Sequence, residues 1–351
     1  MLKRADCRLI ARRTLAWSAL AFLSLQLVLA GAVEAWLPQV RDPEYAVRET
    51  RLVKRLACGN GQGLWLMLGS SRTQLGLQAA RLDETAGSDR VTTFNFGMPG
   101  CGPLMQLICL DRLRVLGVRP KLLLVEINPA MLSWRNGEPL EERMLDGARL
   151  SLSELARVLP LCEQPRRVLG KWAWAQFAAG LRRAGQLRRW LAFDAADDVE
   201  AADYLMDDHG WQIVPWTADA ERRRELTRLA TDQYDGALAN FKPGAKPARA
   251  LRALLNRCQE ESVPVALVLM PEGSSFRKLY GPRAEPALQA FLGDLCREHD
   301  LLLIDGRRWV GDDLFVDGHH LLPDGAVAFT ERFQRNALAV RTAAGPAGGR
   351  K

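Results

Sequence analysis

The sequence predicts an α/β protein, a three-layer α/β/α sandwich with a parallel sheet of about five strands. Five short apolar runs have the length and flanks of buried strands: Leu64–Leu68, Val91–Phe96, Leu122–Ile127, Val265–Met270 and Leu301–Asp305. A helical pattern precedes or follows each run, and strands that alternate with helices favour a parallel sheet covered on both faces. Such sheets hold ligands beyond the carboxyl ends of their strands, so polar residues at those ends are the first candidates for a site.

The first element in chain order is a long apolar helix. No side chain from Thr14 to Val33 is charged, and Gln26 is the most polar one. These twenty residues, at about 1.5 Å each, span about 30 Å, the thickness of a bilayer core. We therefore expect a basic cytoplasmic segment at 1–13 and a transmembrane signal-anchor at 14–36. The chain would cross the inner (cytoplasmic) membrane once, with its body in the periplasm or outside the cell.

Two other interpretations of this apolar run stay open. The small residues Ala30-Gly31-Ala32 are typical of a signal-peptide cleavage site. A buried helix of a soluble protein is the third possibility. The run is longer than the usual core of a signal peptide, which favours an uncleaved anchor.

The distribution of charge excludes a general nucleic-acid-binding surface. The formal net charge is +7 over 351 residues, of which residues 1–13 carry +4 and the tail from Arg341 carries +3. The body of the chain therefore sums to zero, and we expect no nucleic-acid partner. The hydrophobic content of 48% is that of a globular protein.

The seven cysteines do not define a metal site. Cys7 precedes the apolar run, and the six that follow it allow 15 disulfide pairings, among which the sequence does not choose. No CxxC or His/Cys spacing indicates zinc, and we expect neither a metal nor a cofactor.

The chain after the apolar helix divides into a core domain and an insertion. The predicted strands and their helices fall in residues 50–129 and 246–340, which we expect to form one domain. Between the third and fourth strands lie far more residues than one crossover needs. We expect residues 130–245 to be a largely helical insertion or cap beside the site, and residues 341–351 to be a disordered tail.

One stretch of the predicted insertion is basic and rich in tryptophan. Residues 164–190 hold seven basic side chains and no acid, whereas residues 194–208 hold seven acids and no base. As a single helix, the basic stretch would place Trp172, Phe177 and Leu181 on an apolar side, which is the composition of an interfacial membrane helix. The alternative, which we favour, is a cap helix whose arginines pair with the following acids.

Two segments at predicted strand ends carry the residues of nucleophilic catalysis. Gly69-Ser70-Ser71-Arg72 follows the first strand, and Asp317-Gly318-His319-His320-Leu321 lies near the end of the chain. A serine hydroxyl becomes a good nucleophile when an imidazole removes its proton, and a carboxylate fixes the tautomer of that imidazole. In Asp-x-x-His, a spacing of three lets one turn present both groups to the same point.

These segments resemble the first and last motif blocks of the SGNH/GDSL hydrolase superfamily. The resemblance implies a flavodoxin-like fold with Ser71 as the nucleophile, Asp317 as the orienting acid and His320 as the general base. Two intermediate segments extend it: Asn95-Phe96-Gly97-Met98-Pro99-Gly100 and Glu126-Ile127-Asn128-Pro129. They imply an oxyanion hole made by the backbone of Gly100 and the side chain of Asn128. The family's usual Gly-x-Asn-Asp pattern is absent from the second of these segments.

The resemblance implies a serine esterase or O-acyltransferase that acts on an acyl ester through an acyl-enzyme on Ser71. Anchored, extracytoplasmic members of the superfamily often modify acyl groups on cell-envelope polysaccharides, some of them beside a membrane-bound acyltransferase. A glycan substrate and such a partner are therefore expectations for this chain. The alternative is a catalytically inactive binding or assembly protein of the same fold, which the altered third block and the large insertion motivate.

Three neighbouring residues have other expected roles. Ser70 occupies the family's aspartate position and is predicted to be a helix N-cap or turn former. His319 is expected to face solvent or contact substrate. His209, in Asp207-Asp208-His209-Gly210-Trp211, belongs either to a surface turn, which we favour, or to a part of the insertion that approaches the site.

Overall fold

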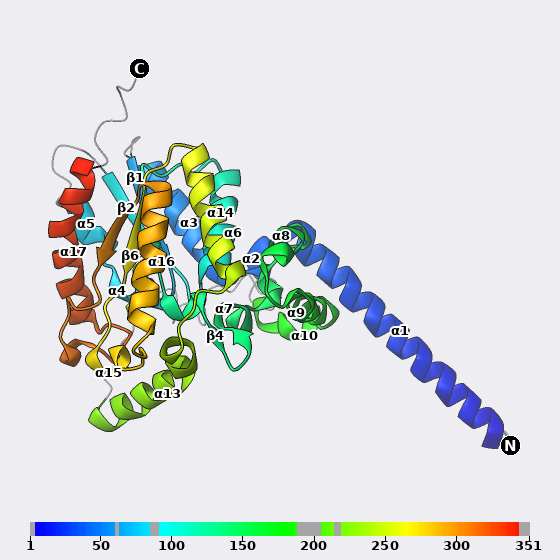
Figure 1. The fold of residues 1–351 in the computed structure, drawn as a ribbon. Coiled ribbons are helices and arrows are strands. Elements are labelled where there is room, and N and C mark those ends of the chain that lie inside the picture. Colours follow the sequence, from blue (N-terminus) through cyan, green and yellow to red (C-terminus); the bar gives the residue numbers. More distant parts are fainter. Residues whose placement is uncertain (1–3, 60–62, 85–90, 188–204, 214–218, 344–351) are drawn as a thin grey trace.

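A five-stranded parallel sheet forms the centre of the protein (Figure 1). The computed structural model describes residues 4–59, 63–84, 91–187, 205–213 and 219–343. The strand order is β2-β1-β3-β6-β7, and the strands are β1 (Gly63–Gly69), β2 (Val91–Gly97), β3 (Leu122–Glu126), β6 (Val265–Leu269) and β7 (Leu302–Asp305). Each coincides with a predicted run to within one residue at either end. The predicted α/β class and the five-stranded parallel sheet are therefore confirmed.

Helices cover both faces of the sheet. Alternate residues of β1 point to opposite faces: Leu66 and Leu68 belong to one apolar cluster and Met67 to another. The first cluster is covered by α3 (Pro43–Cys58), α6 (Pro103–Val115), α14 (Ala245–Glu260) and α16 (Ala284–His299). The second is covered by α4 (Ser71–Gly76), α5 (Ala79–Glu84) and α17 (Pro323–Ala343). This strand order is that of flavodoxin-like sheets, whose ligand crevice lies at the switch point between β1 and β3.

Short elements fill the chain between β3 and β6. They are η1 (Pro129–Leu132), β4 (Trp134–Arg135), β5 (Glu138–Pro139), α7 (Leu140–Met144), η2 (Gly147–Arg149), α8 (Leu152–Val158), η3 (Leu159–Leu161), α9 (Pro165–Phe177), α10 (Ala179–Arg182) and α13 (Ala220–Ala239). The interpretation of the basic stretch as a single helix is wrong, because α9 ends at Phe177 and α10 begins at Ala179. Residues 188–190 of this stretch lie outside the described residues. Most of the predicted acidic stretch, residues 194–204, lies outside the described residues.

A long N-terminal helix projects from the domain (Figure 1). α1 (Arg4–Trp36) is followed by α2 (Pro38–Arg41). The helical segment Ile10–Trp36 is long enough and apolar enough to cross a bilayer. Most large apolar side chains of this helix are exposed, whereas Gln26, Ala30 and Val33 are buried where the insertion packs on its C-terminal part. α15 (Ser274–Arg277) follows β6, η4 (Asp312–Leu314) follows β7, and the domain ends in α17. Residues 344–351 lie outside the described part.

The six cysteines that follow the apolar run are all free thiols in the structure. Cys101, Cys109, Cys162 and Cys258 are buried. Burial raises the pKa of Cys258 to about 12 and that of Cys162 to about 12, which keeps both thiols protonated. These two cysteines therefore act as small hydrophobic side chains.

Candidate active site

Ser71, His320 and Asp317 form one hydrogen-bonded chain. Ser71 is the first residue of α4, directly after β1 and Ser70, so its hydroxyl stands at the carboxyl edge of the sheet. Its Oγ lies 2.8 Å from His320 Nε2, and His320 Nδ1 lies 2.7 Å from Asp317 Oδ2. The backbone amide of His320 also donates to Asp317 Oδ1 at 2.8 Å. This arrangement has the geometry of a nucleophile, a base and an orienting acid.

The carboxylate of Asp317 is held in its ionised form. Burial raises its pKa, but the adjacent imidazoles of His319 and His320 and the hydrogen bond from His320 Nδ1 outweigh burial. The pKa of Asp317 is therefore well below its usual range. An ionised carboxylate at Nδ1 keeps the proton of His320 on that nitrogen, which leaves Nε2 free to accept the proton of Ser71.

The turn that carries Ser71 is held by a buried glutamate that the sequence analysis did not single out. Glu126 ends β3, and its Oε2 accepts hydrogen bonds from the Ser70 amide at 2.6 Å and from Thr73 Oγ1 at 2.5 Å. Its Oε1 accepts from Ser70 Oγ at 2.8 Å. A side chain at Gly69 would collide with Glu126 and Thr73, so glycine is required there. Glu126 thus fixes the start of α4 from the neighbouring strand.

Ser70 has the predicted role of helix N-cap. Its Oγ accepts a hydrogen bond from the Arg72 amide at 3.2 Å. Asn95 of β2 holds the other end of α4, because its side-chain amide donates to the carbonyls of Thr73 at 2.7 Å and Leu77 at 2.8 Å. The ends of β1, β2 and β3 therefore meet around the Ser71 turn.

The two residues expected to form an oxyanion hole lie at neighbouring strand ends. Gly100 is in the loop after β2, and Asn128 follows β3 as the N-cap of η1. Asn128 Oδ1 accepts a hydrogen bond from the Ala130 amide at 3.2 Å. Among the described residues, neither the Gly100 amide nor Asn128 Nδ2 has a hydrogen-bond acceptor, so both remain available as donors. The Gly100 loop is secured by Glu141 of α7, which accepts from the Gly102 amide at 3.0 Å.

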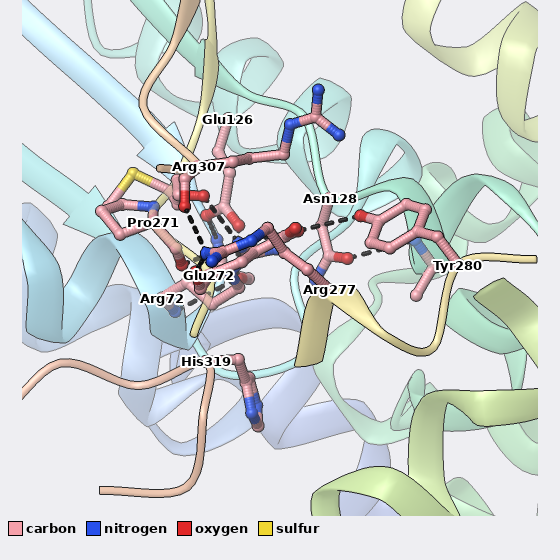
Figure 2. Close-up of polar contacts among 12 residues, drawn as sticks. Arg72, Glu126, Asn128, Pro271, Glu272, Arg277, Tyr280, Arg307 and His319 are labelled. Carbon is pink, nitrogen blue, oxygen red and sulfur yellow. Dashed lines mark hydrogen bonds and ion pairs between the residues drawn. The ribbon is translucent and has the colours of Figure 1, made fainter. Parts of the chain in front are cut away.

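A buried arginine ties the start of α4 to the end of β6 (Figure 2). The guanidinium of Arg72 is almost fully buried, and its Nη2 donates to the carbonyls of Met270 at 2.8 Å and Pro271 at 3.1 Å. It lies 3.2 Å from Glu272 Oε1, which also accepts from the Tyr280 hydroxyl at 2.9 Å. Burial lowers the pKa of Arg72, but the carboxylates of Glu272 and Glu126 raise it further, so the group is charged.

His319 is buried, so the expectation that it faces solvent is wrong. Its ring stacks on Phe276 at 5.0 Å between centroids and meets the edge of Tyr234 at 5.0 Å. Its Nδ1 lies 3.2 Å from Asp317 Oδ1. Burial and then the adjacent His320 lower the pKa of His319 to about 4, so it is neutral near pH 7. The side chain packs beneath the Asp317–His320 loop.

By residue type, Asp317, His319 and His320 could together hold a metal ion. In the structure both nitrogens of His320 already have partners, Ser71 at Nε2 and Asp317 at Nδ1. A metal on this cluster would have to displace one of these contacts. The geometry therefore fits proton transfer from Ser71 better than metal binding.

The turn that contains His209 is packed on the domain, so the preference for a surface turn is wrong. His209 is buried, and its Nδ1 lies 3.1 Å from the Thr93 carbonyl of β2. Trp211 Nε1 donates to the Leu75 carbonyl at 2.8 Å. This part of the insertion therefore covers α4 and β2, beside the turn that carries Ser71.

Comparison with solved structures finds similarity to a lipolytic protein of the G-D-S-L family and to carbohydrate esterases. One is described as a lipolytic protein of the G-D-S-L family from Desulfitobacterium hafniense, with a TM-score of 0.36 and 9% identity over 78% of this chain and 99% of that one. Another is a carbohydrate acetylesterase family member from Sinorhizobium meliloti, with a TM-score of 0.34 and 10% identity over 79% of this chain and 98% of that one.

A third is a catalytic mutant of an acetylxylan esterase from Geobacillus stearothermophilus, with a TM-score of 0.36 and 11% identity over 78% of this chain and 93% of that one. No protein-family profile matches the sequence. No curated protein matches it either. The chain is therefore similar to these esterases in structure, at low sequence identity.

Proposed function

We propose that this chain is a serine esterase or O-acyltransferase that forms an acyl-enzyme on Ser71. The observation that carries the proposal is the hydrogen-bonded chain from Ser71 through His320 to Asp317 at the carboxyl edge of the sheet. Glu126 and Arg72 support it, because each makes several buried hydrogen bonds that hold the turn carrying the Ser71 hydroxyl. Such restraint of a reacting group is what catalysis by positioning requires.

The proposed first step is acylation. Ser71 Oγ attacks the ester carbonyl while its proton passes to His320 Nε2, and the carbonyl oxygen becomes an oxyanion. The Gly100 amide and Asn128 Nδ2 are the proposed donors to this oxyanion. The intermediate collapses as the ester C–O bond breaks, and the departing alcohol takes the proton from His320. The acyl group remains on Ser71.

The second step reverses the roles of the same groups. His320 removes a proton from water or from an acceptor hydroxyl, whose oxygen attacks the acyl-enzyme. Collapse of the second intermediate returns the proton to Ser71 and releases an acid or a new ester. We propose a cell-envelope glycan as the natural acceptor or donor, as the motif resemblance implies, and a membrane-bound acyltransferase as a partner.

Turnover of aryl acetates by the purified full-length chain tests the proposal. Ser71→Ala is expected to abolish turnover. Ser70→Ala is the matched control, because it removes the adjacent hydroxyl and the helix cap but leaves the proposed nucleophile. Activity that survives Ser71→Ala would reject the proposal. Absence of all ester turnover in the folded wild-type chain would favour a binding or assembly role.

We also propose that α1 is an uncleaved anchor that crosses the cytoplasmic membrane, with the domain on its outer side. The exposed apolar side chains along α1, among them Leu15, Phe22 and Val28, support it, since lipid would cover them. The full-length protein is expected to stay with membranes during carbonate extraction. Recovery of a soluble mature form that begins near Val33 would show that the segment is a signal peptide instead.

A further inference from the structure

A polar residue of the apolar helix contacts the insertion. Gln26 is the most polar side chain between Thr14 and Val33, and it is buried. Its Oε1 accepts a hydrogen bond from the Gly180 amide of α10 at 2.7 Å. A side chain at Gly180 would lie 3.1 Å from Gln26 and from Leu29, so the glycine lets the two helices approach closely. α9 and α10 thus both pack on α1 (Figure 1).

This contact lies well inside the apolar span. Gln26 precedes Val33 by seven residues, which correspond to about 10 Å along a helix at about 1.5 Å per residue. A bilayer core is about 30 Å thick, so its outer half is about 15 Å deep. If residues 14–33 fill the core, Gly180 lies within the hydrocarbon of the outer leaflet. In that arrangement the insertion reaches below the membrane surface beside the anchor.

The exposed side of α9 and α10 carries large apolar side chains, and Arg166 and Arg167 are exposed at the first turn of α9. Four large side chains are exposed there: Leu169 at 44%, Trp174 at 60%, Phe177 at 46% and Leu181 at 71%. The rings of Trp174 and Phe177 stack at 6.0 Å between centroids. The opposite face packs inward through Val168 and Ala175, which are fully buried.

We propose that α9 and α10 form a second membrane element that lies in the outer leaflet beside α1, with lipid acyl chains covering Trp174, Phe177 and Leu181. The proposal rests on α1 crossing the bilayer, as proposed above. The exposed apolar side chains of α9 and α10 adjoin those of α1, because the helices meet at the Gln26–Gly180 contact. The lipid that would surround α1 would therefore cover α9 and α10 as well. Arg166, exposed at the first turn of α9, lies where a basic side chain can meet lipid headgroups.

The second membrane element is linked to the candidate active site. Lys171 of α9 donates to the carbonyls of Glu142 at 2.8 Å and Arg143 at 2.7 Å, next to Glu141. Glu141 in turn holds the Gly102 amide at the start of α6, close to Gly100. The hydrogen bonds of Lys171 therefore attach α9 to α7, the short helix whose Glu141 holds the loop of Gly100. Two points of attachment, α1 and α9–α10, fix the height and tilt of the site above the membrane, which a single helix would not do.

The full-length chain, reconstituted in phosphatidylcholine–phosphatidylglycerol vesicles, tests the proposal. Two variants, Trp174→Cys and Leu181→Cys, are each labelled with a nitroxide. The collision rate of each label with oxygen, which is enriched in lipid, is compared with its collision rate with a water-soluble nickel chelate. Val28→Cys on α1 is the lipid control, and Leu229→Cys on α13 is the matched control for an exposed apolar residue of the domain. All four side chains are exposed, so their replacement removes no core contact. Native thiols that could also react are replaced by serine: Cys7, Cys58 and Cys296.

Labels at Trp174 and Leu181 are expected to have an oxygen-to-nickel ratio near that of Val28 and several-fold above that of Leu229. If Val28 is in lipid while Trp174 and Leu181 resemble Leu229, the second membrane element is rejected and the anchor stands. If the label at Val28 itself is accessible to the nickel chelate, α1 is not in lipid, and both the anchor and the second membrane element are rejected. Spectral broadening between labels on two molecules at Leu181 would reject lipid as the occupant and assign the face to a second copy of the chain.

Discussion

Glu126 accepts hydrogen bonds from both the backbone amide and the hydroxyl of Ser70, the residue before the proposed nucleophile. The end of β3 therefore holds the turn after β1, and the hydrogen bonds of this carboxylate go to Ser70 and Thr73 rather than to Ser71 or His320. Glu126 is a positioning residue in this arrangement.

Glu126→Gln is expected to lower kcat with little change in KM. The amide keeps the size of the side chain but replaces one acceptor oxygen by a donor, so the three hydrogen bonds cannot all form. Displacement of a reacting group by about 1 Å can cost about 100-fold, and we expect a loss of roughly 10- to 100-fold. Steady-state kinetics with an aryl ester measure it. Glu298→Gln, at the exposed end of α16, is the control and should have wild-type kinetics. A raised KM at unchanged kcat would contradict a positioning role.

Ser71→Ala, Asp317→Ala and His320→Ala are each expected to reduce ester turnover, and their losses should not add. The three residues act as one hydrogen-bonded unit, so once one is missing the others contribute little. Residual catalysis of roughly 10³ to 10⁴ over water is typical when a triad member is removed. Turnover by the single, double and triple variants measures the effect. His319→Ala should be much milder, and an equal loss in that variant would mean that His319 is the base.

Arg72→Met is expected to destabilise the fold by about 3 to 5 kcal/mol, because it leaves the buried Glu272 without its cationic partner. Replacing both residues, as Arg72→Met with Glu272→Gln, should cost less than the sum of the two single changes. Urea unfolding of the detergent-solubilised chain measures these free energies as a double-mutant cycle. Arg228→Met removes an exposed pair with Asp232 and should change the stability by less than about 1 kcal/mol. Strict additivity at Arg72 and Glu272 would contradict the coupling.

The stability of the fold is expected to fall as the pH drops from 6.5 toward 4. His319 has its pKa lowered to about 4 by burial, whereas an unfolded histidine titrates near 6.5. Between these values the unfolded state binds more protons, so the free energy of unfolding rises with pH, by up to about 3 kcal/mol. Urea unfolding at several pH values measures this slope. His319→Phe keeps an aromatic ring but no proton and should flatten the slope. If the slope is the same in His319→Phe as in the wild type, groups other than His319 cause the pH dependence of stability.

The sequence predicted the sheet for a physical reason that is local, whereas the pairing of Ser71 with Asp317 and His320 came from the resemblance to the superfamily's motif blocks. Strands buried on both faces are continuous apolar runs, and the Asp-x-x-His spacing is contained in a single turn. Glu126 and Arg72 were missed as positioning residues because their partners are distant in the sequence. Ser70 follows β1, whereas Glu126 ends β3, and Glu272 follows β6, whereas Arg72 lies in α4. A lone acid that ends an apolar strand was the available signal for Glu126.

The insertion was harder to predict because tertiary contacts decide its helices. The basic stretch breaks at Ala178, where Gly180 approaches Gln26 of a helix more than 150 residues away. His209 is buried through its contact with Thr93 of β2, which no local pattern indicates. Trp172, expected on the apolar side of a single helix together with Phe177, instead donates to the Leu150 carbonyl at 3.1 Å.

The most direct test of the proposed acyl-enzyme is the site of covalent modification by a fluorophosphonate. The full-length chain would be incubated with the probe, digested, and the modified peptide sequenced by mass spectrometry. We expect one adduct, on Ser71, which disappears in Ser71→Ala, weakens strongly in His320→Ala and persists in Ser70→Ala. An adduct on another serine, or no adduct on the folded chain, would contradict the assignment of Ser71 as the nucleophile.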